Sequence, residues 1–156
     1  MSGKKLLYFL GILIVIILLM FSFYIANKQP SSSPNSTPTS TAATLIIPVP
    51  GGTVPVNNIT QNPVQQADDT VLFAQTSQYS IIYYTQEQTF SITINAQPVQ
   101  AARDAAEAAL LQKLGITKTQ ACSLTVTTYV PYDVDQNLAG QDYGLSFCQS
   151  GKAFGN

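Results

Sequence analysis

The residues best suited to chemistry form a run of oxygen-bearing side chains near the C-terminus. Asp133, Asp135 and Asn137 alternate along the chain, and Asp142 follows five residues after Asn137. Alternating oxygen ligands of this kind open calcium-binding loops of the EF-hand type. The pattern then departs from that type, because its sixth position is leucine rather than glycine and its twelfth is glycine rather than glutamate. The run therefore predicts a polar loop, with a weak calcium site at these residues as the alternative.

Cys122 and Cys148 are the only thiols in the chain. In an oxidising compartment two cysteines most simply form one structural disulfide, and closing this loop of about 26 residues stabilises a fold by about 3.5 kcal/mol in the chain-entropy model. The spacing has no CxxC redox signature, and the chain has no histidine. Zinc binding, Cys–His nucleophiles and Ser-His-Asp catalysis in their usual forms are therefore not expected. We expect a protein that is not an enzyme and has no cofactor beyond the calcium of the alternative above.

Tyrosine is the residue type that most suggests recognition. Six of the eight tyrosines lie at residue 79 or beyond, and tyrosine gives a large contact area with one polar tip. Tyr129, Tyr132 and Tyr143 flank the acidic run, so they form the candidate ligand surface. The alternative is that these residues are strand formers shared between the core and the surface.

An apolar run near the N-terminus, residues 6–26, is the element expected to hold the rest of the chain at a membrane. Residues 6–26 contain no charge over 21 positions, and a helix of that length spans about 31 Å against a hydrocarbon core of about 30 Å. Lys4 and Lys5 precede the run and Lys28 follows it, which favours a cytoplasmic N-terminus. We expect residues 1–28 to form a cytoplasmic tip and a signal anchor that contacts plasma-membrane lipid through residues 6–26, with a cleaved signal peptide as the alternative.

The segment after the anchor is rich in proline, serine and threonine. Seven of the nine prolines lie between residues 29 and 70, and no charged residue occurs from Gln29 to Ala67. Such a composition buries too little apolar surface to offset the ordering of its backbone. The sequence therefore predicts a disordered stalk over residues 29–70.

The remaining chain predicts a small α+β domain over residues 71–150 and a flexible tail over residues 151–156. Periodicity gives the order ββαββ, with one helix on an antiparallel sheet. The expected elements are strands over 79–84 and 90–94, a helix over 98–114, and strands over 124–130 and 143–148. The disulfide is expected to join the last two strands. Arg103 and Glu107 are expected to form an i,i+4 pair on the solvated flank of the helix.

Charge distribution limits the choice of partners. From residue 68 onward the chain has eight acidic and four basic residues, which argues against nucleic acid. Together these features predict a single-pass, membrane-anchored extracytoplasmic binding or envelope-assembly module whose partner is a protein, a peptide or a glycan at the cell surface. The alternatives are a membrane-tethered small inhibitor or regulator of surface enzymes, and a weakly calcium-binding domain.

Overall fold

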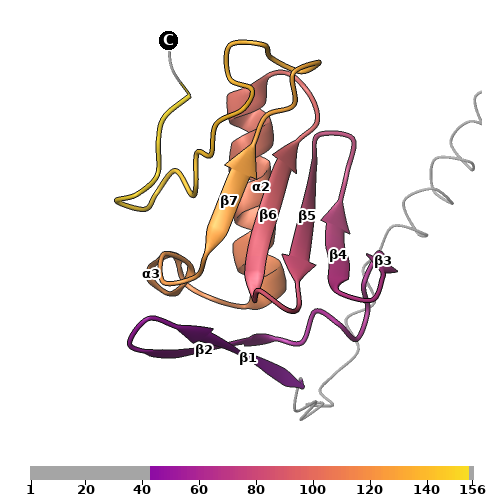
Figure 1. Cartoon of the computed structure of the whole chain (residues 1–156), viewed down its shortest axis with the longest axis vertical. Coiled ribbons are helices and arrows are strands. Elements are labelled where there is room, and N and C mark those ends of the chain that lie inside the picture. Colours follow the sequence, from indigo (N-terminus) through magenta and orange to yellow (C-terminus); the bar gives the residue numbers. More distant parts are fainter. Residues whose placement is uncertain (1–42, 155–156) are drawn as a thin grey trace, which may run out of the picture. The chain divides into compact units, whose positions relative to one another are not determined.

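A five-stranded sheet with one long helix on it lies at the centre of the structure (Figure 1). The computed structural model describes residues 43–154. The strands lie in the order β3 (Gln65–Gln66), β4 (Thr70–Gln75), β5 (Tyr79–Tyr84), β6 (Thr89–Ile94) and β7 (Val126–Tyr129). Neighbours from β3 to β6 are antiparallel, and β7 runs parallel to β6. The expected α+β class, with one main helix and antiparallel pairing, is confirmed.

The alternation of β5 and β6 sorts their side chains onto two faces. Tyr83 pairs with Phe90 and Ile81 with Ile92, and all four are buried. The other face of these strands carries serine and threonine among half-buried apolar residues. Burial raises the pKa of Tyr83 above its usual value of 10.0. The period-2 pattern therefore gives one apolar face, which must be covered.

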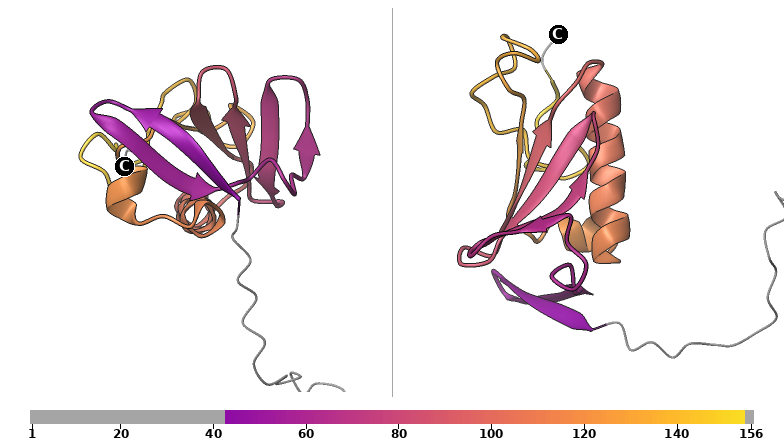
Figure 2. Two further views of the ribbon diagram at one scale, coloured as in Figure 1. Left: turned by 90° about the horizontal axis from the view of Figure 1, so that it is seen from below. Right: turned by 90° about the vertical axis from the view of Figure 1, so that its right-hand side faces the viewer.

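Helix α2 (Val99–Leu114) covers that apolar face (Figure 2). Its buried positions include Ala102, Ala106 and Leu110, and the alanines let the helix lie close to the sheet. The helix ends at Gly115, whose φ of 67° is the left-handed conformation that favours glycine. A Cβ on Gly115 would lie 2.7 Å from Nδ2 of Asn57. Glycine at this position therefore both ends the helix and leaves room for the side chain of Asn57 on a neighbouring strand.

That neighbour belongs to a hairpin formed by β1 (Thr44–Val49) and β2 (Gly52–Asn57), which lies within the expected disordered stalk. The hairpin buries Ile47, Val54 and Val56 against the domain. Asn57 Nδ2 also donates a hydrogen bond of 3.1 Å to the carbonyl of Lys113. The expectation of disorder is therefore wrong for residues 44–57, because alternating apolar residues between the prolines give a buried face.

Strand β7 does not form the antiparallel pair with a following strand that the sequence predicts. The four-residue helix α3 (Lys118–Ala121) follows α2 and begins at a Thr117–Gln120 capping box. Because α2 carries the chain back along the sheet after β6, β7 enters parallel to β6. Residues 143–148 form no strand. The expected fourth strand is therefore wrong.

The anchor and the first part of the expected stalk, residues 1–42, lie outside the described residues. Within residues 43–154 no helix has the length and apolar character needed to cross a membrane.

Candidate functional site: a groove walled by the C-terminal segment

The C-terminal segment, residues 143–154, runs beside β7 without forming a helix or a strand. The amide of Tyr143 donates to the carbonyl of Thr128 over 3.0 Å. The Asp142 carboxylate accepts from the amides of Thr128 and Gly144, each over 2.9 Å. These bonds satisfy polar groups at the outer edge of β7, so the segment covers that edge.

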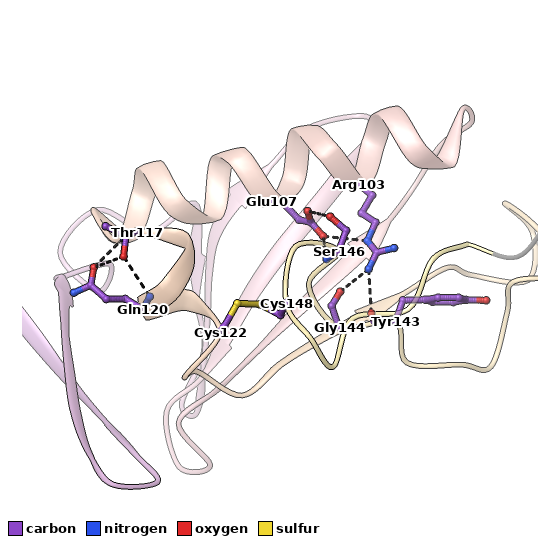
Figure 3. The surroundings of a disulfide bond; sticks show 9 residues. All are labelled: Arg103, Glu107, Thr117, Gln120, Cys122, Tyr143, Gly144, Ser146 and Cys148. Atoms are coloured by element: carbon purple, nitrogen blue, oxygen red, sulfur yellow. Dashed lines mark hydrogen bonds and ion pairs between the residues drawn. A yellow bond between two sulfur atoms is a disulfide. The ribbon is translucent and has the colours of Figure 1, made fainter.

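Arg103 of α2 holds the segment from the inside (Figure 3). Its side chain is fully buried, and Nη2 donates to the carbonyls of Tyr143 and Gly144, each over 3.0 Å. Nη1 donates to the carbonyl of Lys152 over 2.8 Å. The guanidinium carbon also lies 4.7 Å from the ring centroid of Phe154. The carbonyl of Lys152 and the ring of Phe154 are therefore held against Arg103, within the region that the sequence predicts as a flexible tail.

Glu107 completes this buried cluster. Its Oε1 accepts from Arg103 Nε over 3.0 Å and from the amide of Ser146 over 2.6 Å. Its Oε2 accepts from the hydroxyl of Ser146 over 2.5 Å. The expectation of a solvated surface pair is wrong, because both charges face a segment that returns from about 40 residues away and hydrogen-bonds them.

The missed signal is the spacing of these residues along α2. Arg103 lies four residues after Val99 and seven before Leu110, which are the intervals of the buried face. A charged pair at buried-face intervals indicates a partner segment with free carbonyls and hydroxyls. The sequence offers no comparable signal that this partner is residues 143–154.

The predicted disulfide between Cys122 and Cys148 is confirmed, with a Cα–Cα distance of 5.5 Å. Its setting differs from the expected one, because Cys122 ends α3 and Cys148 lies in a turn of the C-terminal segment. The bridge therefore joins α3 to this segment and not two strands of a sheet (Figure 3).

A groove of about 770 Å³ lies between the first turn of α2, the loop over residues 135–141 and the C-terminal segment. Sites for small ligands are typically about 300–1,000 Å³. The apolar part of the lining consists of Val99, Leu138, Tyr143, Ala153 and Phe154. Most of the groove is thus built by the part of the chain that follows β7.

The polar part of the lining consists of Gln100, Asp135, Asn137, Gln141 and Lys152. Several of these side chains are already positioned. Asp135 accepts from the amide of Asn137 over 2.9 Å, and Lys152 Nζ donates to the carbonyl of Asp142 over 3.2 Å. One cation, one anion and three amides offer both donors and acceptors, which suits the binding of a polar ligand.

The three candidate tyrosines are not brought together on one surface. Tyr143 is buried, its hydroxyl donates to the carbonyl of Leu138 over 3.0 Å, and its ring meets Phe154 edge-on. Tyr129 and Tyr132 are 42% and 66% exposed and do not line the groove. Only Tyr143 therefore belongs to the groove, as a supporting wall.

The calcium candidate receives no support from the arrangement of its carboxylates. Within residues 43–154, no three or more acidic, cysteine or histidine side chains form a group that could hold a metal ion. Asp135 and Asp142 accept hydrogen bonds from different backbone segments, and Asp133 is exposed.

The chain matches no protein-family model, no curated protein and no solved structure.

Proposed function

We propose that the protein is a single-pass extracytoplasmic binding module that holds part of a protein, peptide or glycan partner in the groove. In this proposal residues 6–26 anchor it in the plasma membrane with its N-terminus in the cytoplasm. The groove is the observation that carries the proposal, because its lining combines apolar side chains with hydrogen-bond donors and acceptors.

Two further features support an exported location. The uncharged run over residues 6–26 is long enough for a signal anchor. The Cys122–Cys148 bridge suits an oxidising compartment, where disulfides persist. Both follow from one topology, in which the domain lies outside the cell.

Binding suits this groove better than catalysis does. The chain has no histidine to act as a general base. The groove's carboxylate, Asp135, is occupied by the amide of Asn137 and the side chain of Gln97. These groups orient one another and supply no activated nucleophile.

Site-specific photo-crosslinking in the full-length protein, in its own membranes, tests the proposal. A photoreactive residue at Ala153, which lines the groove and is exposed, should give a reproducible adduct. The matched control places the same residue at Thr53, an exposed position on the hairpin. Equal adducts from both positions, or no adduct from Ala153, would contradict the proposal.

A further inference from the structure

We propose that Cys122–Cys148 is a redox-sensitive clip: reduction by a dithiol lets the C-terminal segment open far more often, and the groove loses its wall. Cys122 is exposed and Cys148 is half-buried. The bridge therefore lies at the surface on the Cys122 side, where a reductant in solution can approach it. The effect on binding rests on the function proposed above, whereas the opening of the segment does not.

The position of the bridge in the chain ties it to the groove. The covalent ring runs from Cys122 to Cys148 and contains the lining residues Asp135 to Tyr143. The remaining wall residues, Lys152 to Phe154, begin four positions after Cys148. Cleavage of one bond therefore releases a constraint on two of the three groove walls.

The clipped segment and the main core are held by different interactions. The core between α2 and the sheet is apolar and includes Ile81, Ile92 and Leu110, all fully buried. The segment adds Tyr143 and Leu145 to that core, but residues 146–154 are exposed or half-buried and are held mainly by the polar contacts of Arg103 and Glu107. Segments of this kind open locally without global unfolding.

The dithiol supplies the two electrons that reduce the Cys122–Cys148 disulfide. A thiolate of the dithiol attacks the Cys122 sulfur, forming a mixed disulfide, and Cys148 leaves as a thiolate that takes up a proton. The second thiol of the reductant then attacks the mixed disulfide. Cys122 is released as a thiolate that takes up a proton, and the reductant leaves as a cyclic disulfide, having given its two electrons to the two cysteine sulfurs.

Loss of the cross-link returns chain entropy to the open state of the segment. For a fully disordered ring of about 26 residues the chain-entropy model gives a population increase of about 300-fold, which is the upper limit here because β7 stays paired inside the ring. The hydrogen bonds of Arg103 still stabilise the closed segment after reduction, and the factor multiplies the population of the open segment. Reduction therefore changes how often the segment opens and leaves its closed structure the same.

Hydrogen–deuterium exchange on the full-length protein in detergent micelles tests the clip without any ligand. After treatment with dithiothreitol, peptides from residues 143–154 should exchange at least tenfold faster, up to the factor of about 300. Peptides from residues 79–114 should be unchanged. Unchanged exchange over residues 143–154 would overturn the proposal, and so would equal acceleration over both regions, because the bridge would then staple the whole domain.

The Cys122→Ser/Cys148→Ser variant is the matched control. It should exchange fast over residues 143–154 without reductant and should not respond to dithiothreitol; a response would show that another group is involved and would overturn the clip. Crosslinking from Ala153 before and after reduction separates the two proposals. An adduct that persists undiminished after reduction contradicts the link to binding, whereas no adduct in either state contradicts only the proposed function.

Discussion

Arg103 is a buried cation whose hydrogen-bonding capacity is almost completely used. Four of its five N–H groups are matched by the carboxylate of Glu107 and the carbonyls of residues 143, 144 and 152. The forked geometry matters, because a lysine ammonium has only three N–H donors on one nitrogen and cannot serve four acceptors spread around a guanidinium. This side chain therefore links the first half of α2 to a segment that has no secondary structure of its own.

Removing one partner of this pair should cost more than removing both. We expect Arg103→Met to lower the free energy of unfolding by about 3–5 kcal/mol, because it leaves a buried carboxylate uncompensated. Arg103→Met/Glu107→Leu should recover a large part of that loss. Urea denaturation of the three proteins measures the effect, and a double variant less stable than the single variant would contradict this account.

Gly151 is the second residue on which the C-terminal segment depends. A Cβ there would lie 1.9 Å from the carbonyl oxygen of Leu145, which is backbone and cannot turn aside. We expect Gly151→Ala to displace the segment and to speed amide exchange over residues 143–154. Gly52→Ala is the control, because nothing lies within 4 Å of its added Cβ. Similar exchange in the two variants would show that the close approach does not hold the segment.

At the scale of elements, the β1–β2 hairpin shows what prolines can do inside a strand. Pro48 pairs with Thr53 and Pro55 with Ile46. Because proline has no N–H, both pairs must be of the kind without cross-strand hydrogen bonds, and each ring nitrogen faces the outer edge. Each exposed edge therefore lacks one donor that an added strand would need.

Restoring those donors should make the protein self-associate. We expect Pro48→Thr/Pro55→Val to shift it toward dimers or larger species, measured by sedimentation velocity at matched concentration. Pro63→Thr, outside the strands, is the control and should leave the distribution unchanged. An unchanged distribution in the double variant would mean that the prolines do not protect the edges.

The same prolines explain why the hairpin could not be predicted. Strands β5 and β6 and helix α2 follow from local periodicity, which the sequence displays without interruption. In β1 and β2 the apolar alternation is broken by prolines and surrounded by a polar, uncharged context that resembles a linker. Local pattern therefore pointed to disorder, while burial against the end of α2 decides the outcome.

The groove could not be predicted for a different reason. The sequence identifies Asp135, Asn137 and Tyr143 as candidate site residues, and each lines the groove. Their meeting with Lys152 and Phe154 depends on the contacts of Arg103 with carbonyls about 40 residues away. Backbone carbonyls carry no sequence signal, so no pattern in the chain identifies that meeting.

At the scale of the whole molecule, the charges are segregated by position. Three lysines flank the apolar run, no charge occurs from Gln29 to Ala67, and all eight acidic residues follow. If the run is a signal anchor, this order places the acidic, disulfide-bonded part outside the cell.

Labelling of intact cells checks that topology. In the Cys122→Ser/Cys148→Ser background, we expect Thr53→Cys to react with a membrane-impermeant maleimide, because this exposed position lies outside the cell if residues 6–26 are a signal anchor. Ser2→Cys should react only after permeabilisation. The reverse pattern, or equal labelling of both before permeabilisation, would contradict an N-terminus in the cytoplasm.

The folded hairpin also shortens the part of the chain that can act as a linker between residues 6–26 and the domain. Only 17 residues separate Ala26 from Thr44, where β1 begins, and a chain of that length reaches at most about 60 Å. The stalk expected over residues 29–70 would have reached roughly 140 Å or more by the same rule. If residues 6–26 form an anchor, β1 therefore begins within about 60 Å of the end of that anchor, and a neighbour in the same membrane meets the domain at a high effective concentration.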